Sequence, residues 1–213
     1  MNNSIYQNKS YKNPNIWISI DLEMNNDPED ESAEDSGLVI SDIIQIGACA
    51  FDIQTGVILG NFKKYVKLPK DKKLHPKITK LTGITEDDLN TQGTSLYLAY
   101  KELEYFINQY DGVFRHSVSW GGDDGKYLLN ELINKCSFNE KFIFSPSSYV
   151  DVKKVYQIYC MMNNISIRSG LGKSLTRVGL NFIGRQHDAL DDSINTARML
   201  FYLSNFLKLP TIK

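Results

Sequence analysis

The order of extended and helical segments constrains the fold of this chain more than any other feature. Three strand-like runs precede any amphipathic helix and cover residues 15–23, 41–52 and 57–68. The short connection Gln54–Gly56 joins the second run to the third and is typical of a tight turn. The second and third runs are therefore predicted to form an antiparallel hairpin.

Helical spacing of apolar residues begins only after this hairpin. Two further strand candidates, residues 112–120 and 148–152, alternate with segments whose apolar residues recur at helical intervals. The predicted helices cover residues 94–110, 124–136, 152–162, 172–179 and 188–207. Strands first, followed by strands alternating with helices, predict a mixed sheet with helices packed on it.

The chain has 213 residues, which suits one domain with a substantial core. We expect the asparagine-rich residues 1–14 to form a flexible N-terminal arm and residues 15–207 to form the domain. The acidic insertion 27–35 reads as a solvated loop just after the first strand. An acidic loop at that place could also repel a negatively charged substrate.

Overall charge neither favours nor excludes a polyanionic partner, because 24 Lys and Arg residues face 25 Asp and Glu residues. One local stretch, residues 63–80, holds eight lysines and a single acid. Its Lys72, Lys73 and Lys77 are candidates for binding nucleic-acid phosphates. The alternative is that this stretch is only a solvated surface.

Three cysteines, Cys49, Cys136 and Cys160, lack the paired spacing of a zinc site or a disulfide framework. We interpret them as small buried apolar residues. No apolar run approaches the roughly 18 residues needed to cross a bilayer, and the first residues lack the apolar core of a signal peptide. We therefore expect a cytoplasmic protein with no membrane partner.

Two carboxylates end the first predicted strand. Asp21 and Glu23 lie two residues apart, so the alternation of side chains along a strand points both to one face. Neighbouring carboxylates repel each other, and a hard divalent cation is a natural counter-charge. Many strands also end in acids at a solvent edge, so this pair alone leaves both interpretations open.

A third carboxylate opens the helix predicted over residues 124–136. Leu128 and Leu132 follow Asp124 at i+4 and i+8, so Asp124 shares the face that is predicted to be buried. A buried carboxylate needs a partner. The alternative is that Asp124 is the N-cap and that the helix starts one residue later.

Four ionisable residues, His187, Asp188, Asp191 and Asp192, crowd the start of the last predicted helix. Helix capping and the helix dipole explain the aspartates one by one, but not the histidine. A metal-binding carboxylate beside a histidine that exchanges protons near neutral pH is what phosphodiester hydrolysis requires. The predicted apolar stripe of this helix is Leu190, Ile194, Ala197 and Phe201.

In this order the motifs resemble those of the DEDDh exonucleases, the DnaQ-like 3′-to-5′ group. They stand as DLE at 21–23, SWGGDD at 119–124 and HDALDD at 187–192, and the resemblance covers roughly residues 15–205. Residues 171–198 look like the branch of histone-mRNA 3′-end and RNA-interference-regulating exonucleases and their bacterial relatives. The resemblance implies an RNase H-like α/β fold, a mixed five-stranded sheet with helices on both faces.

The same resemblance implies roles for individual residues. Asp21, Glu23 and Asp192 would hold one catalytic metal ion, and Asp21 with Asp124 would help to position a second. His187 would be the general base that takes a proton from the attacking water. Mg²⁺ or Mn²⁺ suits such an all-oxygen site, and two ions would stabilise the attacking and leaving oxygens.

Other positions follow the family pattern less closely. By resemblance only, Met24 and Leu81 would pack against the terminal nucleotide. Asp123 stands where many close relatives have an aromatic residue, which leaves a base-stacking contact unassigned, and Met24 stands where a small polar residue is frequent.

The leading hypothesis is a 3′-to-5′ exonuclease that acts on single-stranded RNA and releases nucleoside 5′-monophosphates. A DNA-directed enzyme of the same family is the alternative, since the carboxylates act on the phosphate while the 2′-hydroxyl is read elsewhere. A catalytically silent module that binds nucleic acid or a partner would have no reason to keep mutually repelling carboxylates. The sequence identifies no protein partner.

Overall fold

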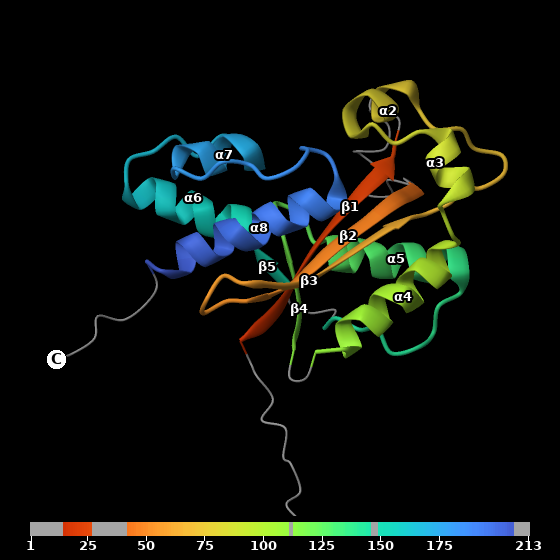
Figure 1. Ribbon diagram of the computed structural model, residues 1–213, viewed down its shortest axis with the longest axis horizontal. Coiled ribbons are helices and arrows are strands. Elements are labelled where there is room, and N and C mark those ends of the chain that lie inside the picture. The colour runs from red at the N-terminus through yellow and green to blue at the C-terminus, as the bar shows by residue number, and fades with distance from the viewer. Residues whose placement is uncertain (1–14, 27–41, 111–112, 146–148, 207–213) are drawn as a thin grey trace, which may run out of the picture.

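The computed structural model describes residues 15–26, 42–110, 113–145 and 149–206, and a sheet of five strands runs through its centre (Figure 1). The strands are β1 (Ile16–Asn25), β2 (Asp42–Asp52), β3 (Ile58–Tyr65), β4 (Phe114–Ser119) and β5 (Tyr149–Asp151). The predicted arm 1–14 and the acidic insertion 27–35 lie outside the described residues. So does residue 207, the predicted end of the domain.

The sheet is mixed, as predicted, with the strand order β3-β2-β1-β4-β5. Strand β2 pairs antiparallel with both β1 and β3, which confirms the hairpin, whereas β4 pairs parallel with both β1 and β5. The carboxyl ends of β1, β4 and β5 therefore meet at one edge of the sheet. Residues that follow these three strands in the sequence are brought together there.

Helices cover both faces of the sheet (Figure 1). Helices α4 (Leu96–Asn108) and α5 (Asp124–Cys136) pack on one face. Helices α6 (Val152–Met162), α7 (Leu171–Arg177) and α8 (Ala189–Ser204) pack on the other. Within the described residues, no helix combines the length and the apolarity that crossing a bilayer demands.

Two short helices, α2 (Pro76–Thr82) and α3 (Glu86–Thr91), were not predicted from the sequence. Each spans two turns or fewer, which is too short for apolar periodicity to stand out. Local caps define them instead. Pro76 occupies the first helical position of α2, and Thr85 and Asp88 form a capping box at the start of α3.

Alternation along β1 separates the core from the site. Ile18, Ile20 and Leu22 are buried against the α4 and α5 side of the sheet. Asp21 and Glu23, at the intervening positions, therefore point to the face that α8 covers. The three cysteines are free, and Cys49 and Cys160 are buried as predicted, while Cys136 is half-buried.

The start of α8 lies directly against the backbone of β2. A Cβ atom placed on Gly47 would stand 2.0 Å from the carbonyl carbon of Ala189, so only glycine fits there. Ala189 is fully buried, and its N–H donates a hydrogen bond of 2.7 Å to the Gln45 side-chain carbonyl. A small residue at position 189 thus admits the neighbouring backbone of β2.

The predicted apolar stripe of α8 is only partly correct. Ala197 is fully buried, but Leu190, Ile194 and Phe201 are half-buried. The close approach of this helix to β2 leaves little room for large side chains, so several of the residues that it buries are small or polar. These are Ala189, Ser193, Asn195, Thr196 and Ala197.

Replacing Gly47 by Ala should lower the free energy of unfolding by roughly 1–3 kcal/mol, because the added methyl group must push α8 away from β2. Urea denaturation of the purified protein measures this loss. Gly122→Ala is the matched control, since nothing lies within 4 Å of a Cβ atom at that position. Equal stability of the two variants would contradict the close packing of β2 and α8.

Candidate active site

Four predicted carboxylates gather at the sheet edge where β1, β4 and β5 end. Asp21 and Glu23 come from β1, Asp124 is the first residue of α5, and Asp192 lies in the first turn of α8. A cleft of about 480 Å³ opens onto the site and is lined in part by Asp21, His187 and Asp192. The structure thus brings together five residues that lie up to 171 positions apart in the sequence, the separation of Asp21 and Asp192.

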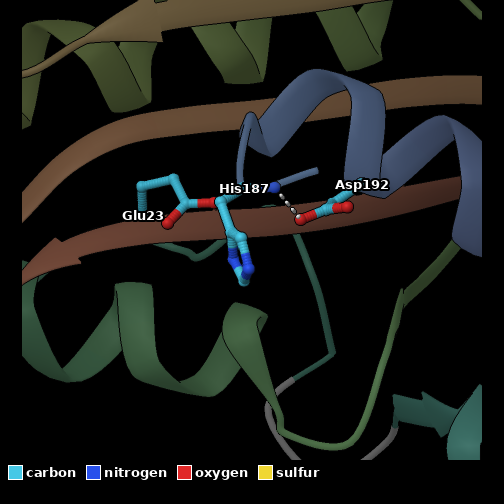
Figure 2. A group of neighbouring side chains, drawn as sticks. All are labelled: Glu23, His187 and Asp192. Atoms are coloured by element: carbon cyan, nitrogen blue, oxygen red, sulfur yellow. Dashed lines mark hydrogen bonds between the residues drawn. The ribbon is translucent and has the colours of Figure 1, made fainter. Parts of the chain in front are cut away.

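Glu23, His187 and Asp192 form the tightest group in the site (Figure 2). One potential metal-binding atom from each lies within 4.8 Å of the other two. The backbone N–H of His187 donates a hydrogen bond of 3.1 Å to the Asp192 carboxylate. This bond ties the loop that carries the histidine to the helix that carries the aspartate.

His187 precedes the helix, in a backbone conformation with φ of 63°. Asp188 is the N-cap of α8, and its carboxylate accepts hydrogen bonds from the N–H groups of Leu190 and Asp191. The position of the His187 side chain is therefore not fixed by helical spacing. Its side chain is exposed at the cleft, whereas Asp188 is half-buried and forms an ion pair with Lys63.

Asp191 and Asp192 have different surroundings although they are neighbours. The Asp191 carboxylate accepts a hydrogen bond of 2.7 Å from the N–H of Arg185 and lies against Gly184, where a Cβ atom would stand 2.2 Å from its Cγ. It holds the loop before the helix. Asp192 instead lines the cleft with Asp21 and His187.

Asn195 holds the same loop from the next turn of the helix. Its amide group donates to the carbonyl of Ile183 and accepts from the N–H of the same residue, at 2.8 and 3.1 Å. Gln45 positions the helix start from β2. Sequence reasoning did not assign these two positioning residues, although a glycine inside the β2 sequence signals a close backbone approach.

The alternative that Asp124 is an N-cap is wrong. Asp123 is the cap of α5, and its carboxylate accepts hydrogen bonds from the N–H of Lys126 and from the Ser117 hydroxyl. Asp124 is the first residue of the helix and shares its face with Leu128, which is fully buried. This capping role accounts for an aspartate at position 123.

Burial and mutual repulsion keep the site acids from ionising easily. The pKa of Asp21 is raised well above its ordinary value, first by burial and then by the charges of Asp124, Asp192 and Glu23. Burial, with the repulsion of Asp192 next in importance, raises the pKa of Glu23 to about 8. Burial likewise raises the pKa of Asp124 to about 7 and that of Asp192 to about 6.

This donor set fits a divalent cation. Among the described residues, no lysine or arginine forms an ion pair with Asp21, Glu23, Asp124 or Asp192. Four carboxylates without a cationic partner in a partly desolvated site need positive charge, and hard oxygen ligands favour Mg²⁺, Ca²⁺ or Mn²⁺ over softer metals.

The two residues expected to contact the terminal nucleotide lie in different settings. Leu81, on α2, is 47% exposed, and its carbonyl accepts a hydrogen bond of 3.3 Å from the Arg185 guanidinium. It therefore lies beside the loop that leads to His187. Met24 is half-buried and packs against the core on the α4 and α5 side.

The basic stretch 63–80 divides into lysines with different surroundings. Lys72 forms an ion pair of 2.7 Å with Asp42, which is buried and also pairs with Lys135. Lys72 thus has a structural partner. Lys73 and Lys77 are exposed near the start of α2, and their role in binding substrate stays a prediction.

Other cleft residues were not singled out by the sequence analysis. Trp120, which follows β4, packs against Tyr156 and lines the cleft together with Lys153 and Lys173. The two lysines lie on α6 and α7, and only the folding of these helices over the sheet edge brings them to the site. No sequence spacing could have connected them with the carboxylates.

The fold is that of solved nuclease domains, and the site holds four acids and a histidine. The chain belongs to the exonuclease family, whose sequence model matches residues 18–200.

Its relatives include "ERI1 exoribonuclease 2" of Mus musculus, 25% identical over 175 residues that make up 73% of this chain and 24% of that protein. The "3′-5′ exoribonuclease 1" of Homo sapiens is 23% identical over 163 residues, 75% of this chain and 45% of that protein. The chain thus spans a quarter to less than half of the length of these curated relatives. The nuclease domain of 3′hExo, a DEDDh family member bound to rAMP, has the same fold, with a TM-score of 0.72 at 20% identity over 92% of this chain and 94% of that one.

Replacing Asp21 by Asn should stabilise the protein in the presence of a chelator, and more at pH 8 than at pH 5. A raised pKa means that the folded state holds protons that the unfolded state has released. The site acids therefore cost stability increasingly as pH rises from about 4 to 8, and removing one relieves part of that cost. Thermal unfolding measures the effect, with about 2–4 °C expected per kcal/mol.

Asp71→Asn serves as the control, because Asp71 is an exposed acid outside the cluster. Added Mg²⁺ should raise the melting temperature of the wild type more than that of Asp21→Asn. A gain for Asp21→Asn that is the same at both pH values would contradict a raised pKa of Asp21 in the folded protein.

Proposed function

We propose that this protein is a 3′-to-5′ exonuclease that hydrolyses single-stranded RNA and releases nucleoside 5′-monophosphates. The observation that carries the proposal is the convergence of Asp21, Glu23, Asp124 and Asp192, with His187 beside them, at one cleft. Membership of the exonuclease family supports the reaction class. The names of the curated relatives support RNA as the substrate.

Two ions of Mg²⁺ or Mn²⁺ suit the four carboxylates. We infer that Asp21, Glu23 and Asp192 hold one ion and that Asp21 with Asp124 holds the second. When bound, such ions stabilise the charge on the attacking and leaving oxygens of an in-line displacement at phosphorus. The protein supplies the fixed spacing, because its carboxylates project from β1, α5 and α8, which the core holds rigidly.

His187 acts as the general base in this proposal. Its exposed imidazole stands at the cleft beside Glu23 and Asp192 and takes the proton of the attacking water. Its backbone is anchored on Asp192, so the proton acceptor keeps its place relative to the carboxylates. Asp192 thereby serves both as an acid of the site and as the anchor of the histidine loop.

Two other functions were considered for the same fold, a DNA-directed exonuclease and a catalytically silent binding module. A DNA-directed exonuclease would use the same carboxylates, since these act on the phosphate and not on the sugar. A silent binding module would use none of them. The intact acid cluster, with raised pKa values that cost stability, favours an enzyme over a binding module.

We also propose that the protein works in the cytoplasm. Its three free cysteines, two of them buried, support a reducing compartment.

The reaction can be tested with one preparation of the protein and four oligonucleotides: RNA and DNA, each single-stranded and duplex, labelled at the 5′ or the 3′ end. We expect ladders that shorten from the 3′ end, fastest on single-stranded RNA, and nucleoside 5′-monophosphates as products. Faster cleavage of DNA would select the DNA-directed alternative. Binding without Mg²⁺-dependent hydrolysis would select the silent module.

Asp192→Asn should lose nearly all turnover, whereas Asp191→Asn should keep most of it. Asp192 lines the cleft, while Asp191 holds the preceding loop through a backbone hydrogen bond that asparagine can still accept. Steady-state hydrolysis of a labelled RNA compares the two, with melting temperatures as a check on folding. An inactive Asp191→Asn beside an active Asp192→Asn would refute this assignment of the site.

His187→Ala should reduce turnover strongly and leave Mn²⁺ affinity close to that of the wild type, because a proton acceptor is not a required metal ligand. Calorimetric titration with Mn²⁺ measures the affinity. A variant that loses turnover and metal binding together would identify His187 as a ligand.

A further inference from the structure

A second hollow adjoins the active-site cleft. The cleft of about 480 Å³ and a neighbouring hollow of about 420 Å³ share Lys153 and Gly170 in their walls. Together they form a groove, which we call the α6–α7 groove, that leads from His187 and Asp192 toward the segment before α7. The residues that line the second hollow are Lys153, Gln157, Ile167, Arg168, Ser169 and Gly170.

The chain that builds this groove carries positive charge and no negative charge. Between Asp151 and Asp188 the sequence has no acidic residue and six basic ones. Three of these, Lys153, Arg168 and Lys173, line the cleft or the second hollow. In the part of the chain that the structure describes, none of the three forms an ion pair.

The nearest acid at the start of α6 is already engaged. The Asp151 carboxylate accepts hydrogen bonds from the N–H groups of Gly121 and Lys154 as it caps the helix. The cations of the groove are therefore left to act on a ligand. A run of unpaired lysines and arginines along a groove is the arrangement that binds the backbone of a single nucleic-acid strand.

The opposite side of the site is closed by contacts between α2 and the segments around it. The Arg185 guanidinium donates to the carbonyl of Leu81 and lies so close to Gly83 that a Cβ atom there would stand 1.6 Å from a guanidinium nitrogen. The Asn25 side chain, at the end of β1, bonds to the carbonyl of Lys73 and the N–H of His75.

Figure 1 shows α2 on one side of the start of α8, and α6 and α7 on the other. The α6–α7 groove therefore leads away from the site on the side opposite α2.

We propose that the nucleotides on the 5′ side of the cleaved bond lie in the α6–α7 groove and that Lys153, Arg168 and Lys173 bind their phosphates. The 3′-terminal nucleotide then lies on the closed side, beside Leu81 on α2. This arrangement gives a structural reason for cleavage at an end and not within a strand. The proposal rests on the proposed exonuclease function and adds the direction in which the substrate runs.

The test is a variant that carries Lys153→Gln, Arg168→Gln and Lys173→Gln. On a single-stranded RNA octanucleotide its kcat/KM should fall by about tenfold at moderate salt, and the slope of log affinity against log salt should shrink by about two, since each lost contact on a single strand is worth about 0.7. On the 4-nitrophenyl ester of a nucleoside 5′-monophosphate, which has no phosphate beyond the reacting one, the rate should fall much less than on the octanucleotide. The ester therefore separates strand binding from the chemistry of the carboxylates.

A matched control carries Lys126→Gln, Lys141→Gln and Lys154→Gln. These lysines are exposed and line neither hollow, and their substitution removes the same positive charge as in the groove variant. Lys154 is the direct neighbour of Lys153 in the sequence. The control should keep both rates close to those of the wild type. An equal loss of kcat/KM on the octanucleotide in the two triple variants would show that only the overall charge matters, and it would overturn the proposal.

Three further results would also overturn the proposal. The groove variant could keep its kcat/KM on the octanucleotide, or it could lose activity equally on the octanucleotide and the ester. The activity on the octanucleotide could also fall only in a variant with Lys73→Gln and Lys77→Gln. The last result would place the strand over α2. If the wild type hydrolyses neither substrate, the proposed function fails, but anisotropy of a fluorescent octanucleotide in a chelator still tests the groove. Weaker octanucleotide binding by the groove variant than by the wild type would support the strand path. Equal binding by the two proteins would refute the strand path.

Discussion

Four carboxylates and a histidine crowd one edge of the sheet, and the burial and mutual repulsion of these acids set the demands on the surrounding fold. Burial raises the pKa values of Asp21, Glu23, Asp124 and Asp192 most, and the charges of Asp124 and Asp192 add to that effect at Asp21 and Glu23. Such a cluster costs stability at neutral pH until cations compensate it. The surrounding fold must therefore hold these side chains together against their own charge.

The fold meets this requirement through backbone contacts more than through the site residues themselves. Gly47 and Gln45 of β2 fix the start of α8, and Asn195 and Asp191 hold the loop in front of it. None of the four belongs to the predicted metal ligands. They fix the distance between a strand and a helix, and that distance decides whether Asp192 reaches the acids of β1.

Charge is distributed unevenly over a chain whose net charge is only −1. The acids gather where the phosphodiester bond would be cleaved, and the segment between Asp151 and Asp188, which carries only basic charges, forms the groove that leads away from them. The net charge near zero therefore results from an acidic site and a basic groove that lie side by side. In the basic stretch 63–80, Lys72 serves a different purpose, since it neutralises the buried Asp42.

The sequence predicted the five strands in order, the hairpin, five of the helices and the five residues that the structure brings together, but it left open whether Asp124 caps its helix. Periodicity and turn residues act over short distances, and the acids stand out because neighbouring carboxylates are costly in any fold. It did not determine α2 and α3, which depend on caps and are too short to show a period, nor the buried face of α8, where small side chains allow contact with β2.

Tertiary contacts make Asp123 the cap of α5 and turn Asp124 inward. They also bring Lys153, Arg168 and Lys173 to the cleft or the hollow beside it. The physical reason is that parallel strands align their carboxyl ends. Side chains that are far apart along the chain become neighbours there without leaving any spacing in the sequence.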